Sequence, residues 1–136
     1  MEAEKILATI KEHLLAQPDI AAAYVFGSAA QNRLRPASDI DIAVLFSSGT
    51  AAKTARFERR LELAVALEEL LKRPVEVIDL EAVPPFLQYQ IRKHGKLIVD
   101  KDPQRRKACE VASRRLYLDM LPCLRYRRER ALERLG

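Results

Sequence analysis

The sequence predicts an α/β protein in which a small mixed β-sheet is flanked by helices and followed by a basic helical tail. Short apolar runs of strand length alternate with longer segments in which apolar residues recur every three or four positions. The 136 residues, 49% hydrophobic and 32% charged, are typical of one soluble domain with a real core. Positive charge is concentrated at the end, where residues 105–136 hold ten Lys or Arg against four Asp or Glu.

We expect residues 1–100 to form one domain and residues 101–136 a helical extension that packs on the domain or on a partner. The pattern predicts a helix over residues 102–120, an interruption near Pro122 and a second basic helix to the end. A basic tail can contact nucleic acid, which we do not favour, or an acidic partner. The alternative is a solvated helix whose arginine stems cover apolar surface.

The first part of the chain predicts a helix, two strands and a second helix. Residues 3–16 carry an apolar stripe at helical spacing that ends before Pro18. Residues 20–26 and 39–46 are apolar runs of strand length, and residues 51–72 return to helical spacing. The core residues expected in this second helix are Phe57, Leu61, Ala64, Leu67 and Leu71.

The next part predicts a third strand at residues 75–80, a turn at 81–85, a short helix at 86–93 and a last strand at 96–99. The end of that short helix is basic, which complements the helix dipole, and its side chains are expected to face solvent: Arg92, Lys93 and His94.

Several classes of protein are excluded by composition. No apolar run approaches the ~20 residues of a membrane span, and the first ten residues lack the basic-then-apolar plan of a signal peptide. The expected location is therefore the cytoplasm. Cys109 and Cys123 are too few for a zinc site or a disulfide framework, so both are expected to be reduced thiols.

Two aspartates interrupt the second predicted strand. Asp39 and Asp41 are two positions apart, so both carboxylates point to the same side of the strand, whereas Ile40, Ile42 and Val44 point into the core. Neighbouring carboxylates repel each other, which favours a cation between them. Mg²⁺ suits this site, because it commonly takes one or two protein carboxylates and leaves other positions to water and substrate phosphates.

A Gly-Ser pair follows the first predicted strand. Gly27 can adopt dihedral angles closed to other residues, which turns backbone N–H groups toward an anion. Ser28 adds a hydroxyl donor at the start of a short helix, where phosphate is favoured. A phosphate cradle followed, ten residues after the serine, by paired aspartates indicates a site for nucleoside triphosphates.

Gly27, Ser28, ten intervening residues and then Asp39 and Asp41 match the GSx10DxD signature of the polymerase β-like nucleotidyltransferases. Over roughly residues 5–100 the chain resembles their minimal nucleotidyltransferase (MNT) branch, small prokaryotic proteins that often act as antitoxin beside a HEPN-domain RNase toxin. The resemblance implies the polymerase β-like fold, ATP as substrate and Mg²⁺ bound by Asp39 and Asp41.

The resemblance also implies a third acidic residue and a phosphate contact. The superfamily places the acid in a hydrophobic-acid-hydrophobic pattern on the third strand, which Glu76 matches; a strand-edge glutamate facing water is the alternative. Asp79 has the opposite strand parity and is the weaker candidate. Many MNT relatives carry Ala-Arg-Gly soon after Gly-Ser, but Gln31 and Asn32 stand here in place of Arg and Gly, so Arg33 is the candidate substitute.

The implied function is transfer of AMP from ATP to a tyrosine of a HEPN toxin, which silences the toxin. One alternative is an antitoxin that masks the toxin by binding alone, which the missing Arg-Gly keeps open. Another is an enzyme that modifies an aminoglycoside, although such enzymes usually carry a longer C-terminal helical domain. A metal-binding protein unrelated to nucleotides would make the spacing from Ser28 to Asp39 a coincidence.

Overall fold

The structure is a computed structural model that describes residues 2–27, 39–47 and 53–135. Its four-stranded sheet has the order β3-β2-β1-β4, with β2 and β3 parallel and the other two pairings antiparallel. The mixed sheet expected from the sequence is therefore confirmed. The strands are β1 (Ile20–Phe26), β2 (Ile40–Phe46), β3 (Val75–Asp79) and β4 (Lys96–Asp100).

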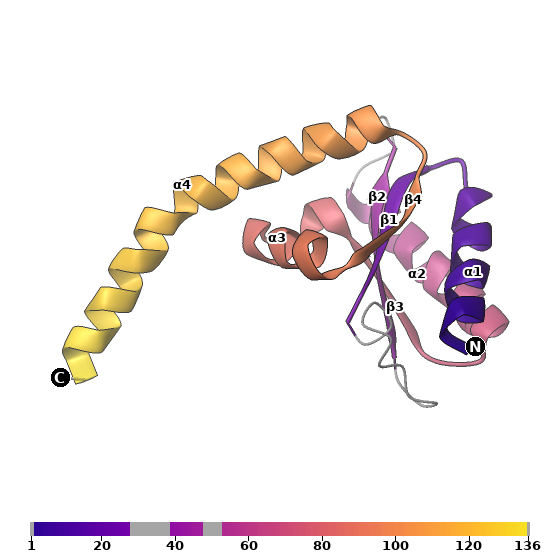
Figure 1. Cartoon of the computed structure of the whole chain (residues 1–136), viewed down its shortest axis with the longest axis horizontal. Helices are drawn as coiled ribbons and strands as arrows, with labels where there is room; N and C mark the ends of the chain where they lie inside the picture. Colours follow the sequence, from indigo (N-terminus) through magenta and orange to yellow (C-terminus); the bar gives the residue numbers. More distant parts are fainter. Residues whose placement is uncertain (1, 28–38, 48–52, 136) are drawn as a thin grey trace.

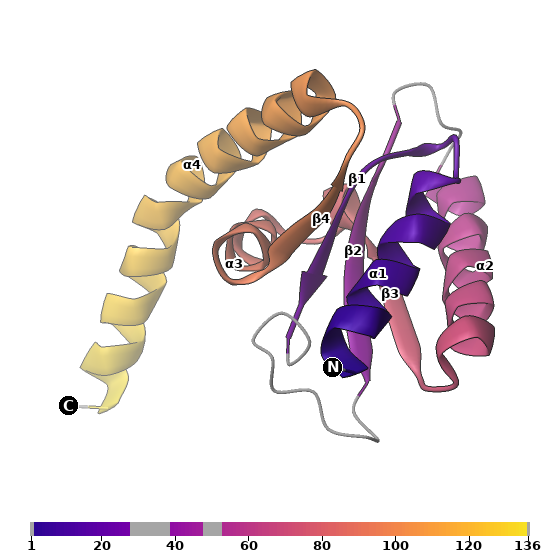
Figure 2. The ribbon, with the colours of Figure 1, turned by 45° about the vertical axis from the view of Figure 1, so that its right-hand side comes forward.

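Helices cover both faces of this sheet (Figures 1 and 2). The helices α1 (Glu2–Leu15) and α2 (Lys53–Leu71) lie on one face, and α3 (Pro85–His94) with the start of α4 (Pro103–Leu135) lies on the other. A 3-10 helix, η1 (Leu80–Ala82), occupies the start of the predicted turn. Among the described residues no helix has the length and apolar character needed to cross a bilayer.

Alternation along the strands produces two separate cores. Ile40, Ile42 and Val44 of β2 pack with α1 and α2, as their parity predicts, in one large cluster. The intervening Ala43 and Leu45 pack on the opposite face with Tyr24, Leu80, Ile91 and Cys109. Because β2 is buried on both faces over most of its length, only its first residues remain available for chemistry.

The core expected for α2 is partly wrong. Phe57 and Leu61 are 54% and 49% exposed, whereas Leu63 and Leu67 are buried against the sheet. Leu67 is buried as expected, and the half-buried Ala64 and Leu71 pack against the same core. The covered face of the helix is therefore rotated away from Phe57 and Leu61 toward Leu63, and the apolar period alone does not fix that rotation.

The interruption expected near Pro122 is also wrong, because α4 runs unbroken through 33 residues. Proline removes one backbone N–H and its ring crowds the carbonyl four residues earlier, which bends a helix without ending it. Figures 1 and 2 show that α4 bends along its length and extends away from the sheet. From Arg114 to Leu135 every side chain is exposed except the half-buried Tyr117 and Leu121.

Whether residues 101–136 form a separate extension, with a boundary after residue 100, stays a prediction. The first turns of α4 pack on the sheet through the buried Cys109. Both cysteines are free, as expected, and Cys123 is exposed.

Candidate active site

The turn after β1 lies directly against a carboxylate. Gly27 has a positive φ of 73°, a conformation that favours glycine. A Cβ placed on it would lie 2.7 Å from Oδ2 of Asp41, far inside van der Waals contact. The sheet register explains this proximity, because Phe26, the residue before Gly27, is the antiparallel partner of Asp41. The structure therefore brings Gly27 and Asp41 together, as the nucleotide hypothesis requires.

A second carboxylate belongs to the adjacent strand. Asp41 and Glu76 are register partners in the parallel pair of β2 and β3, so their side chains leave the sheet on the same face. This is the face that α3 and α4 cover further along the strands. Glu76 is exposed, and its neighbours Val75 and Val77 point into the opposite core. Asp39 is exposed immediately before β2.

The three carboxylates interact electrostatically. Burial raises the pKa of the half-buried Asp41, and the negative charges of Glu76 and then Asp39 raise it further. Both neighbouring charges therefore make ionisation of Asp41 less favourable. A divalent cation would relieve that repulsion, and carboxylate oxygens are ligands that Mg²⁺ accepts.

The acidic patch does not by itself form a complete metal cage. Within the described ranges no group of three or more His, Cys, Asp and Glu side chains is arranged to hold a metal ion. A site with one or two carboxylates, completed by water and substrate phosphates, is the usual arrangement for Mg²⁺. Asp39 and Asp41 fit such a site, and the backbone of Gly27 adjoins the Asp41 carboxylate.

Two predicted site residues, Ser28 and Arg33, lie outside the residues that the structure describes. The weaker candidate, Asp79, is buried and pairs with Arg56 at 3.2 Å between Oδ2 and Nε. Its Oδ1 also accepts a hydrogen bond from the backbone N–H of Glu81 at 3.1 Å, which caps η1. Burial raises the pKa of Asp79, while Arg56 opposes that shift. These contacts explain Asp79 as a structural residue.

Sequence reasoning missed a group of side chains between α3 and α4. Arg92, expected to face solvent, is half buried, and its Nη1 donates a hydrogen bond to Oγ of the buried Ser113. Lys93 and His94 are exposed, as expected. The two helices are 21 residues apart at this contact, so no local pattern could have predicted it.

The sequence over most of the chain is that of a nucleotidyltransferase family. The model of the family "Polymerase beta, Nucleotidyltransferase" matches residues 8–104, and the chain belongs to that family. The chain is 35% identical over 92 residues to the protein adenylyltransferase MntA of Shewanella oneidensis. That match covers 68% of this chain and 60% of the relative, so the chain spans less than two thirds of the relative's length.

Solved structures extend the similarity to nearly the whole chain. A crystal structure of a toxin–antitoxin with AMP-PNP is similar with a TM-score of 0.65 and 26% identity, covering 97% of both chains. A crystal structure of the toxin–antitoxin MntA–HepT has a TM-score of 0.58 and 25% identity, covering 98% of this chain and 96% of the other. The expected membership of the MNT branch is thereby supported, and the polymerase β-like fold is confirmed.

Proposed function

We propose that this chain is an antitoxin that transfers AMP from ATP to a tyrosine hydroxyl of a partner HEPN-domain RNase toxin and so neutralises it. The proposal is supported by family membership and by the similarity to a protein adenylyltransferase. The single observation that carries the chemistry is the contact between the Gly27 turn and the Asp41 carboxylate. A phosphate binder and an acidic metal-binding patch are useful together only if they adjoin.

In this proposal Asp39 and Asp41 hold Mg²⁺, which when bound neutralises charge on the triphosphate and on the leaving pyrophosphate. Backbone N–H groups of the Gly27 turn and the Ser28 hydroxyl hold the β- and γ-phosphates, so the α-phosphorus faces an incoming hydroxyl. Glu76 projects from the adjacent strand on the same face as Asp41. It takes the proton of the acceptor hydroxyl or completes a second metal site.

Partner binding is assigned to the outer part of α4. Between Arg114 and Arg134 the helix carries seven arginines and three acidic residues, together with exposed Leu116, Met120 and Leu124. Aromatic and arginine side chains are common anchors of protein interfaces. On this surface the guanidinium carbon of Arg130 lies 5.9 Å from the centroid of the Tyr126 ring. A partner with an acidic, partly apolar groove fits this helix.

The test uses the purified chain, labelled ATP, Mg²⁺ and the HEPN protein encoded by the adjacent reading frame. We expect label on the HEPN protein with the wild type and no label with Asp39→Asn or Asp41→Asn. Glu69→Gln, an exposed acid on α2, is the matched control and should label normally. Mass spectrometry of the labelled protein identifies the acceptor residue, which the proposal requires to be a tyrosine.

Masking without catalysis is the second candidate, favoured by the exposed length of α4. It predicts that the RNase is inhibited without labelling and that Asp39→Asn inhibits it equally well. Label that appears on an aminoglycoside instead of the HEPN protein would overturn both antitoxin candidates.

A further inference from the structure

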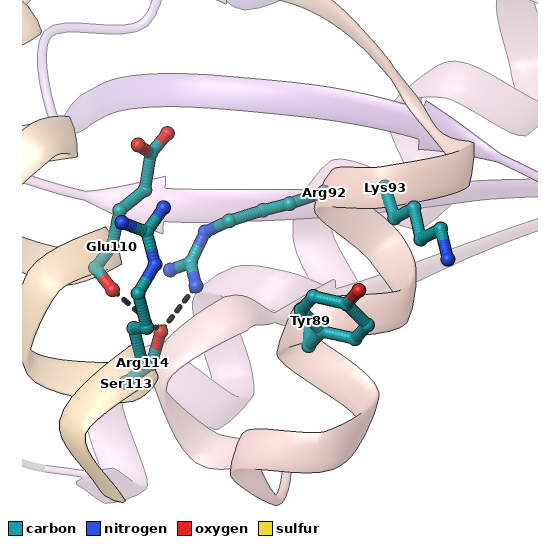
Figure 3. Close-up of a pocket in the computed structure, with 6 residues that line it drawn as sticks. All are labelled: Tyr89, Arg92, Lys93, Glu110, Ser113 and Arg114. Atoms are coloured by element: carbon teal, nitrogen blue, oxygen red, sulfur yellow. Dashed lines mark hydrogen bonds between the residues drawn. The ribbon is translucent and has the colours of Figure 1, made fainter. Parts of the chain in front are cut away.

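A second polar site lies between α3 and α4, lined by none of the three acidic residues of the candidate active site. Its cavity has a volume of about 220 Å³. Figure 3 shows the side chains that line it, three from each helix: Tyr89, Arg92, Lys93, Glu110, Ser113 and Arg114. Pockets that enclose drug-sized ligands commonly measure ~300–1,000 Å³, so this one suits a smaller ligand.

The lining has an excess of positive charge. Arg92, Lys93 and Arg114 contribute three cations against the single carboxylate of Glu110. That carboxylate is already engaged, because its Oε1 accepts hydrogen bonds from Arg106 at 2.9 Å and from the Tyr24 hydroxyl at 3.4 Å. Little of its charge is left to balance the cations of the cavity.

Arg92 lacks a counter-ion in the part of the chain that the structure describes. Its guanidinium donates to neutral groups, the Ser113 hydroxyl, Sγ of Cys109 at 3.3 Å and Oε1 of Gln88 at 3.4 Å, and it also interacts with the Tyr24 hydroxyl. Burial raises the pKa of the Cys109 thiol, so the sulfur stays protonated and supplies no negative charge. A half-buried guanidinium without a counter-ion is costly, which favours binding of an anion.

Hydrogen-bonding capacity is also left unused. Nε of Arg92 is buried and has no partner among the described atoms. Lys93 lies over the Tyr89 ring with its Nζ 5.7 Å from the centroid, and neither it nor Arg114 forms a salt bridge within the described ranges. Figure 3 shows Arg92 and Arg114 approaching each other from opposite helices beside Ser113. Both guanidinium groups therefore line the same cavity, which an anion can enter from outside.

We propose that this cavity binds the phosphate group of a small molecule, either free phosphate or a nucleoside monophosphate. Guanidinium groups form paired hydrogen bonds with phosphate oxygens. The three cations and one carboxylate of the lining leave an excess of two positive charges, which a phosphate dianion balances and a carboxylate balances only in part. The Tyr89 ring at the edge of the cavity gives a nucleoside a surface for stacking. This site goes beyond the proposed function, because it uses none of Asp39, Asp41 and Glu76.

The test is isothermal titration of the full chain in EDTA, which removes any divalent metal from the candidate active site. Inorganic phosphate, AMP and acetate are the probes. We expect phosphate and AMP to bind and acetate to bind much more weakly. AMP binding about tenfold tighter than phosphate identifies a nucleotide as the ligand, whereas equal affinities identify free phosphate. Acetate binding as tightly as phosphate would overturn the proposal.

Variants locate the binding. Arg114→Gln removes a charge-assisted hydrogen bond and should weaken phosphate and AMP binding about tenfold or more. Lys107→Gln, which removes a charge from an exposed position earlier in α4, lies outside the cavity and should bind like the wild type. Arg92→Gln should also weaken binding, once thermal unfolding shows that the variant is folded. Unchanged affinity in Arg114→Gln would show that the anion binds elsewhere, whatever the result of the labelling assay.

Discussion

The carboxylate of Asp41 occupies the space that a side chain at position 27 would need, with 2.7 Å between its Oδ2 and a Cβ built on Gly27. Two constraints therefore require glycine at this position. One is the positive φ, which costs other residues about 1–2 kcal/mol, and the other is the contact with Asp41. These two contributions can be separated experimentally.

We predict that Gly27→Ala destabilises the protein and that part of the loss depends on Asp41. In an Asp41→Ala background the carboxylate is absent, so the same substitution should retain only the cost of the positive φ. A double-mutant cycle from urea unfolding should give a coupling energy of about 0.5–3 kcal/mol. Equal losses in both backgrounds would contradict the contact.

Removal of the Asp41 charge should stabilise the protein while it abolishes AMP transfer. The pKa of Asp41 is raised in the fold, so ionisation of its carboxyl is less favourable in the folded protein than in the unfolded protein. We predict a higher melting temperature for Asp41→Asn than for the wild type in EDTA. Mg²⁺ should raise the melting temperature of the wild type, through preferential binding to the folded state, and have a smaller effect on Asp41→Asn.

The control for that experiment is Glu69→Gln, which removes a charge from an exposed position on α2. Its melting temperature and its response to Mg²⁺ should equal those of the wild type. A lower melting temperature for Asp41→Asn in EDTA would show that the three carboxylates do not destabilise one another.

An ion pair at the start of β1 should make stability depend on pH in acid. Nε of Arg59 donates to Oδ2 of Asp19 at 2.7 Å, and the hydrogen bond from Arg59 lowers the pKa of that carboxyl below its usual 3.8. A lowered pKa stabilises the fold above 3.8, and the contribution is lost as pH falls through the folded-state value. Asp19→Asn should therefore cost about 1 kcal/mol at pH 7 and little near pH 2.

Melting temperatures of both proteins from pH 2 to pH 7 measure this difference. Glu62→Gln is the matched control, since Glu62 also contacts Arg59, at 3.4 Å, but is much more exposed. We expect it to change stability little at any pH. A constant difference between Asp19→Asn and the wild type across the range would exclude the ion pair as its cause.

Two leucines of α2 should differ sharply in their response to truncation. Leu67 is fully buried, so Leu67→Ala should cost about 2–5 kcal/mol through lost burial and a cavity. Leu61 is half exposed, and Leu61→Ala should change the free energy of unfolding by less than about 1 kcal/mol. Chemical denaturation of the two variants is a direct comparison. Similar losses would mean that Leu61 is also buried.

The same helix shows what sequence can and cannot predict. The period of apolar residues predicted α2 and its approximate ends, because that period is a local property. The exact face that is buried depends on how the helix lies across β2 and β3, which no local pattern encodes. Pro122 gives a second example. A proline marks both bends and ends of helices in a sequence, and in this structure α4 continues through it.

For the candidate site too, some features follow from local sequence and others from the packing of distant segments. Alternation of side chains along a strand predicted which face Asp39, Asp41 and Glu76 occupy. It also predicted that the residues between them are buried. The alignment of Glu76 with Asp41 and the approach of Gly27 depend on strand pairing across the sheet. The roles of these residues in binding metal and nucleotide stay predictions until the labelling experiments are done. Arg92 and Ser113 meet only because α4 folds back over α3.

The length of α4 has a kinetic consequence. At ~1.5 Å per residue, the 33 residues of this helix span ~50 Å. In the proposed function, a partner held along that helix would be tethered before its acceptor hydroxyl reaches the reacting phosphate. Tethering of this kind can raise a local concentration to the millimolar range, so the acceptor itself needs only weak affinity for the catalytic face.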